Sequence, residues 1–104
     1  MGIPRVVTLF AAVLAVQMSG KVLTPNMDGI NDRVSFTLGT PADAPYAQVF
    51  DVRGRRVSAL SSLSSSQLQW DGKDYAGRTV DSGVYLVQIS EASKLWNGIV
   101  VVAK

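Results

Sequence analysis

The chain contains no cysteine and no histidine. Without cysteine there is no disulfide framework, no catalytic thiolate and no lipid-modified N-terminal cysteine. Without histidine there is no serine–histidine triad, and the usual zinc sites are excluded as well. Catalysis would therefore depend on carboxylates, lysine, serine or tyrosine. No pair of these residue types occurs in a recognisable motif, so we expect no enzyme activity.

Charged residues are also few. They make up 17% of the 104 residues, and the formal net charge is only +2. The one basic cluster, formed by Arg53, Arg55 and Arg56, surrounds an expected hairpin turn and should be solvated. Nucleic-acid-binding domains concentrate basic residues on one face, so we predict no nucleic-acid partner. An alternative role for the cluster is contact with an anionic cell-surface polysaccharide or lipopolysaccharide.

The N-terminus carries an apolar run at residues 6–16, preceded by one positive charge at Arg5. This run has the length of a signal-peptide core and is too short for a stable transmembrane span. We predict a signal peptide at residues 1–20 and a mature domain at residues 21–104. The domain would then be extracytoplasmic, either secreted or on a bacterial cell surface. The alternative is a buried N-terminal strand or core helix, because β-branched residues are frequent in this run.

Apolar residues alternate with polar ones through much of the remaining chain. Residues 33–38 alternate strictly, which places Val34, Phe36 and Leu38 on one face of a half-buried strand. The serine-rich residues 61–66 are expected to form an exposed loop. Other β-prone segments, bounded by turn residues, are 21–24, 46–52, 56–60, 67–70, 84–89 and 95–102. About seven short strands and no capped helical period predict a single all-β domain, an antiparallel β-sandwich.

Two successive turns are predicted after Trp70. Asp-Gly at residues 71–72 is a strong turn signal, because glycine adopts positive φ and aspartate accepts hydrogen bonds from the following backbone. Trp70 ends an alternating strand and is expected in the core, whereas the position of Trp96 is left open. If both tryptophans were exposed, they would form a sugar-stacking platform. Tyr85 is expected in the core or at an edge, with its hydroxyl in water.

Asp71, Asp74 and Asp81 are interpreted as turn formers and not as a catalytic group. Paired carboxylates that hydrolyse glycosides need a cleft and a fixed separation. A small sandwich with short loops seldom offers either.

A polar loop at residues 25–32 is a candidate calcium site. Ca²⁺ prefers about six to eight oxygen ligands, which alternating Asn and Asp around a glycine can supply at a sharp turn. The candidate ligands are Asn26, Asp28, Asp32 and the backbone carbonyl of Ile30. The alternative is an Asx-type turn in which these side chains accept hydrogen bonds from backbone N–H groups. No other metal or cofactor is expected.

Three segments together resemble known families. Residues 49–57 resemble the Tyr/Phe-Asp-x-x-Gly-Arg-x-Val hairpin of the FlgD-type immunoglobulin-like domain. Residues 70–85 are similar to the Trp-Asp-Gly-x-Asp-x-x-Gly…Gly-x-Tyr signature of the same family. Residues 24–32 are similar to the Thr-Pro-Asn-Gly-Asp-Gly-x-Asn-Asp opening of gliding-motility-associated C-terminal domains, with Met27 in place of the first glycine. The residues that carry the FlgD-type signature are Gly54, Trp70, Asp71, Gly72, Gly77, Gly83 and Tyr85.

The resemblance implies an immunoglobulin-like β-sandwich without enzymatic activity. Because gliding-motility-associated domains serve as sorting signals of type IX secretion, it also implies a sorting, anchoring or protein-interaction module. Its partner would be an envelope or secretion-machinery protein. Two alternatives stay open: a flagellar hook-cap-type assembly domain, and a carbohydrate-binding accessory module of a secreted enzyme. The second alternative predicts a solvent-exposed Trp96.

Overall fold

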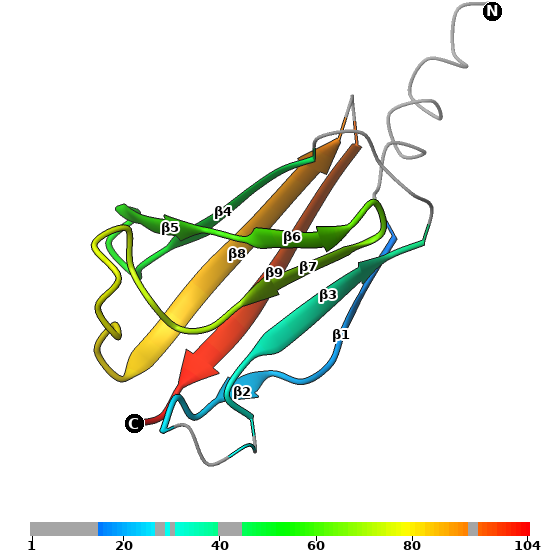
Figure 1. The fold of residues 1–104 in the computed structure, drawn as a ribbon. Coiled ribbons are helices and arrows are strands. Elements are labelled where there is room, and N and C mark those ends of the chain that lie inside the picture. The colour runs from blue at the N-terminus through cyan, green and yellow to red at the C-terminus, as the bar shows by residue number, and fades with distance from the viewer. Residues whose placement is uncertain (1–14, 27–28, 30, 40–44, 92–93) are drawn as a thin grey trace, which may run out of the picture.

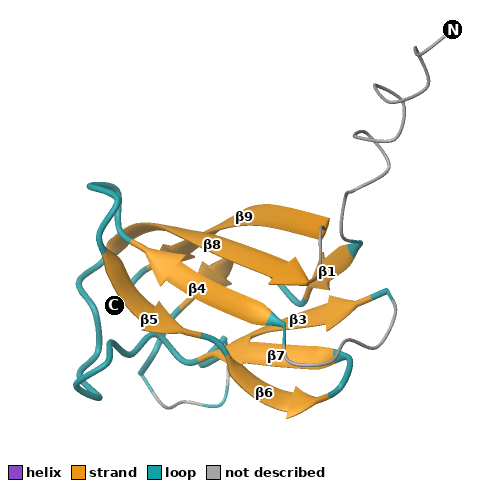
Figure 2. Ribbon diagram, turned by 90° about the horizontal axis from the view of Figure 1, so that it is seen from above, coloured by secondary structure: helices purple, strands orange, loops and turns teal. Residues whose placement is uncertain are grey.

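Two β-sheets pack face to face as a sandwich (Figures 1 and 2). The computed structural model describes residues 15–26, 29, 31–39, 45–91 and 94–104. One sheet has the strand order β1-β3-β7-β6 and the other has the order β2-β9-β8-β4-β5. The strands are β1 (Val16–Met18), β2 (Val22–Leu23), β3 (Val34–Leu38), β4 (Tyr46–Phe50), β5 (Arg56–Ala59), β6 (Ser61–Ser64), β7 (Gln67–Trp70), β8 (Gly83–Glu91) and β9 (Lys94–Val102). The described residues contain no helix, which confirms the all-β prediction.

Pairing within the sheets is antiparallel with one exception. β2 runs parallel to β9, with Val22 beside Val101 and Leu23 beside Val102. This parallel pair arises because the chain leaves the first sheet after β1 and joins the edge of the second sheet at β2 (Figure 1). The N-terminal part of the domain therefore contacts both layers.

Two strands occur where the sequence did not predict them. β1 falls inside the predicted signal peptide at residues 1–20, and pairs Val16 with Leu38 and Met18 with Phe36. β6 falls inside the predicted serine-rich loop at residues 61–66, so that loop prediction is wrong, although every residue of β6 is exposed as expected. Serine repeats have no apolar period, and an edge strand needs only backbone hydrogen bonds to pair.

The core forms where the inward faces of the two sheets meet. Val34, Phe36 and Leu38 of β3 are all buried, which confirms the face predicted by their alternation. The longest strands, β8 and β9, form the most extensive ladder, from Gly83 paired with Val102 to Glu91 paired with Lys94. Within the described part of the chain, there is no helix of the length and apolar character needed to cross a membrane.

Candidate functional site

The turn after β7 is anchored by Trp70. The Trp70 side chain is 2% exposed, in the core as its position predicts. Its indole Nε1–H donates a hydrogen bond to the backbone carbonyl of Lys73, at 3.0 Å. Because a buried indole N–H needs an acceptor, this bond holds the turn against the end of the core.

Tyr85 supports the same turn from β8. Its ring meets the Trp70 indole edge to face, with centroids 5.4 Å apart. Its hydroxyl donates a hydrogen bond to the backbone carbonyl of Asp81, at 2.7 Å. The residue lies in the core, 7% exposed, and its hydroxyl, which the sequence predicted to be in water, is bound to the backbone of the turn in a partly buried position. A tyrosine that bonds backbone a few residues upstream is a recurring feature of immunoglobulin-like sandwiches.

Gly72 lies where the turn after β7 approaches the end of β2 and the residues that follow it. Its φ is +82°, and a Cβ built on it would lie 2.9 Å from Cδ2 of Leu23 and 3.5 Å from Pro25. Its carbonyl accepts a hydrogen bond from the N–H of Val80, at 2.9 Å. Glycine is thus required here both for backbone conformation and for close packing.

Two turns share one sequence pattern and one set of hydrogen bonds. The pattern Asp-x-x-Gly-Arg occurs at residues 51–55 and again at residues 74–78. In each turn the aspartate carboxylate accepts bonds of 2.9–3.0 Å from the backbone N–H groups two and four residues later. In each, the aspartate carbonyl accepts a bond from the glycine N–H at 3.0 Å. The sequence analysis predicted a turn at each place, and the structure shows that the two turns share one hydrogen-bonding pattern.

These two turns lie against each other at one end of the sandwich (Figure 1). The N–H of Tyr75 donates to the carbonyl of Val57 at 3.1 Å, and the Arg56 guanidinium lies 6.0 Å from the centroid of the Tyr75 ring. Arg53 and Arg55 are exposed in the first turn, and Arg55 Nε donates to Oδ2 of Asp51 at 2.9 Å. The basic cluster is therefore solvent-facing, with one guanidinium engaged within its own turn.

Asp51 ionises more readily than an ordinary aspartate. The hydrogen bond from the backbone N–H of Arg55 lowers the pKa of the Asp51 carboxyl most strongly. Burial opposes this effect in part, and the Arg55 side chain and the Arg53 N–H lower the pKa further. These donors bind the charged form, so the carboxylate stabilises the turn while it is ionised.

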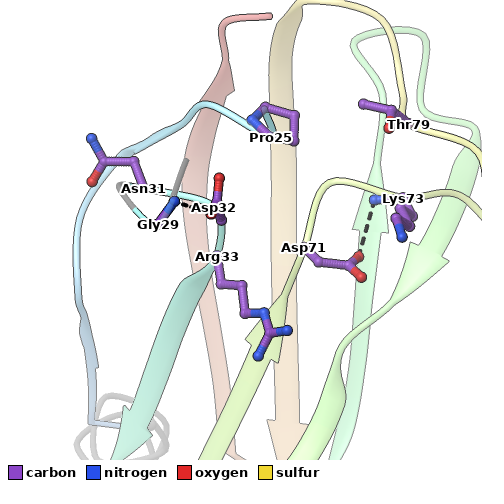
Figure 3. A pocket seen from close by; sticks show the side chains of 8 residues that line it. All are labelled: Pro25, Gly29, Asn31, Asp32, Arg33, Asp71, Lys73 and Thr79. Carbon is purple, nitrogen blue, oxygen red and sulfur yellow. Dashed lines mark hydrogen bonds between the residues drawn. The ribbon is translucent and has the colours of Figure 1, made fainter. Parts of the chain in front are cut away.

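A cavity of about 610 Å³ opens between the loop leading into β3 and the turn after β7 (Figure 3). Arg33 and Lys73 contribute positive charge to it, and Asp32 and Asp71 contribute negative charge. The Asp71 carboxylate accepts a hydrogen bond from the N–H of Lys73, at 3.2 Å. The volume of this cavity lies in the range of ligand pockets. The mixed charges suit a polar backbone or a short charged peptide. The lining residues are Pro25, Gly29, Asn31, Asp32, Arg33, Asp71, Lys73 and Thr79.

The predicted calcium ligands border this cavity only in part. Asp32 lines it, and Oδ2 of Asp32 accepts a hydrogen bond of 2.8 Å from the N–H of Gly29, three residues earlier in the loop. Asp28 and Ile30 lie outside the described residues. Within the described ranges there is no group of three or more His, Cys, Asp or Glu side chains that could hold a metal ion. Calcium binding at Asn26, Asp28, Ile30 and Asp32 stays a prediction.

Trp96 lies on the inward side of β9, partly buried against the core. Its ring meets Phe36 edge to face, with centroids 5.9 Å apart. Trp70 and Trp96 therefore contact different aromatic partners inside the sandwich, and the structure does not bring them together as one exposed platform.

Comparison with known proteins assigns the family. The FlgD Ig-like domain family matches residues 20–94, and the chain belongs to this family. No curated protein matches the chain.

Two solved structures share the fold. PorZ, an essential bacterial surface component of the type-IX secretion system of Porphyromonas gingivalis, matches 86% of this chain with a TM-score of 0.65 and 23% identity. The match covers 12% of the PorZ chain, so this chain corresponds to a small part of that protein. CopC from Methylosinus trichosporium OB3b matches over 86% of this chain and 91% of its own, with a TM-score of 0.52 and 15% identity.

Proposed function

We propose that the chain is a non-enzymatic immunoglobulin-like module that acts outside the cytoplasm in sorting, anchoring or another protein interaction of the type IX secretion kind. The observation that carries this proposal is the likeness of 86% of the chain to part of PorZ, a surface component of such a system. Membership of the FlgD Ig-like family agrees with a module that binds proteins.

The mechanism would be recognition without chemistry on the module itself. The mixed-charge cavity and the paired Asp-x-x-Gly-Arg turns present polar groups on a rigid support, because Trp70 and Tyr85 tie the turn to the core. Rigid loops bind partners with less loss of conformational entropy than mobile ones. The partner in this proposal is an envelope or secretion-machinery protein.

Export in this proposal depends on the N-terminal signal peptide. Cleavage after residue 20 would remove β1, whose Met18 pairs with Phe36. Mass spectrometry of the exported protein would locate the cleavage site. A first residue at or before Ala15 would leave β1 in place, and a first residue near Lys21 would require β3 to function as an edge strand.

A delivery assay tests the proposal. Residues 15–104 would be fused to the C-terminus of a reporter with a standard signal peptide, and surface reporter would be compared in wild-type and type IX-deficient cells. We expect surface display in wild-type cells only. The control is the reporter with its signal peptide and no module. Equal retention of the fusion in the periplasm of both strains would remove the sorting function.

The family match supports one second candidate, a flagellar hook-cap-type assembly domain. Flagellar components are normally exported without a cleaved leader. Recovery of exported protein with an intact N-terminus, dependent on the flagellar apparatus, would favour this candidate.

A carbohydrate-binding role receives less support, because the Trp96 ring contacts Phe36. Addition of polysaccharide should therefore leave tryptophan fluorescence unchanged. Quenching that is lost in Trp96→Phe would restore the carbohydrate hypothesis.

A further inference from the structure

One edge of the five-stranded sheet is largely uncovered. β9 runs from Lys94 to Val102, but β2 pairs with it only at Val101 and Val102. Residues 94–100 have β8 on one side and, among the described residues, no strand on the other. Figure 2 shows β9 at the margin of its sheet. A hollow of about 420 Å³ lies between β1 and the Trp96 side chain.

The backbone of this edge is oriented for pairing. The N–H of Val101 donates to the carbonyl of Lys21, at 2.8 Å, so it points away from β8. Backbone direction alternates along a strand. The N–H and C=O groups of Leu95, Asn97 and Ile99 therefore point out from the same edge.

The edge also lacks the usual protection against pairing. Exposed edges are commonly blocked by charge, proline or a bulge. Between Lys94 and the end of β9 there is neither a charged residue nor a proline, and the β8–β9 register has no shift. Leu95 and Ile99, whose backbones face the edge, are 43% and 54% exposed. Beyond Lys94 the edge is uncharged and regular, and it is therefore suited to another strand.

The sequence of the edge favours a second copy of the same strand. Asn97 is the midpoint of residues 94–100, and Leu95 and Ile99 flank it symmetrically. A two-fold axis through Asn97 would place Asn97 opposite its equivalent and Leu95 opposite Ile99 of the other copy. Each of these pairs would exchange both of its N–H···O bonds. Because no charge opposes a like charge along the seam, the edge is complementary to itself.

We propose that two copies of this chain associate through antiparallel pairing of their β9 edges, centred on Asn97, to form one continuous sheet. The interface is isologous, as two-fold symmetry requires. β2 limits the pairing to residues 94–100, so the contact is smaller than the ~800 Å² per partner of a standard interface. The dimer is therefore weak and forms at high protein concentration. This inference does not depend on the proposed sorting function.

Cysteine cross-linking of the full chain tests the geometry, because the chain has no cysteine of its own. In Asn97→Cys, the two symmetry-related Cα atoms would lie about 5.5 Å apart, within the ~4.4–6.8 Å range of disulfides. Mild oxidation should convert the variant to a covalent dimer on a non-reducing gel.

Gln88→Cys is the matched control. Gln88 is the β8 partner of Asn97, and its Nε2 donates to Oδ1 of Asn97 at 3.2 Å, so both variants lose the same hydrogen bond. In the proposed dimer the two Gln88 positions lie about 15 Å apart, since each is one ~4.8 Å strand spacing further from the axis. No disulfide should form.

The register has its own test. A mixture of Leu95→Cys and Ile99→Cys chains should yield mixed disulfides in preference to either homodimer, since the two Leu95 positions would be about 13 Å apart along the strands.

Sedimentation of Asn97→Pro, which removes an outward N–H and leaves the β8 ladder intact, should show monomer where the parent shows dimer. Equal cross-linking of Asn97→Cys and Gln88→Cys, or none in Asn97→Cys, would overturn the proposal and leave the edge to a strand of another protein.

Discussion

The indole ring of Trp96 lies over Gly98, two residues further along β9. A Cβ built on Gly98 would be 2.2 Å from Cη2 of the ring, so the ring occupies the space that any other side chain would need. The glycine allows the indole to lie along its own strand and to reach Phe36. An aromatic side chain covering a glycine is a known stabilising arrangement in sheets.

Gly98→Ala should therefore destabilise the domain. The added methyl group displaces the ring from Phe36, and overpacking of this kind costs about 1–3 kcal/mol. Gly20→Ala is the matched control, because a Cβ at Gly20 would meet nothing within 4 Å. Urea denaturation measures the free energy of unfolding of both variants. In a Trp96→Ala background Gly98→Ala should cost much less, and an equal cost in both backgrounds would contradict the packing argument.

Gly72→Ala should cost more than Gly77→Ala, although both glycines have nearly the same positive φ, +82° and +81°. Each alanine carries about 1–2 kcal/mol of left-handed strain. A Cβ added at Gly72 would lie 2.9 Å from Cδ2 of Leu23, whereas a Cβ added at Gly77 would meet nothing within 4 Å. Thermal unfolding of the two variants checks the difference. Equal loss of stability would mean that the contact with Leu23 is readily relieved.

Tyr85→Phe should lower the free energy of unfolding by about 1 kcal/mol, because it removes the hydrogen bond to the Asp81 carbonyl and leaves that carbonyl without its donor. Tyr75→Phe is the control, since Tyr75 is 61% exposed. Its stability should match the parent to within about 0.5 kcal/mol.

The raised pKa of Tyr85 predicts that the domain loses stability at alkaline pH. Burial raises the pKa of Tyr85 above its ordinary value of 10.0, and the nearby charges of Asp81 and Asp51 raise it further. The unfolded chain therefore loses this proton first, and the stabilisation present below pH 10 is lost as the pH rises through the folded pKa. Tyr85→Phe should show a smaller fall in melting temperature above pH 10 than the parent.

The lowered pKa of Asp51 predicts that the domain loses stability at acid pH. Its pKa is lowered from 3.8 by backbone and side-chain donors, so its stabilisation is complete above that value and is lost as the pH falls through the folded pKa. Asp51→Asn should be less stable than the parent at neutral pH and should lose less stability below pH 4. Parallel pH–stability curves for the two proteins would refute this role.

The calcium hypothesis predicts a higher melting temperature with added Ca²⁺, because a ligand that binds only the folded state stabilises it. Asp28→Ala should abolish the rise, and Asp74→Ala, in the Asp-x-x-Gly-Arg turn at residues 74–78, should retain it. An identical melting curve in chelator and in calcium would remove the hypothesis.

Local patterns in the sequence determined much of this protein. Period-two alternation identified the buried face of β3, and Asp-Gly identified the turn after Trp70, because backbone conformation there depends on neighbouring residues alone. The recurring motifs also indicated the family that the later comparison confirmed.

Only the tertiary structure decided where these elements meet. It paired β2 with β9 in parallel, made an edge strand of a serine repeat, brought Gly72 against Leu23 and turned the Tyr85 hydroxyl to the Asp81 carbonyl. It also left residues 94–100 of β9 uncovered among the described residues. Such contacts join residues distant in the chain or depend on which strand lies beside another, and no local periodicity carries that information.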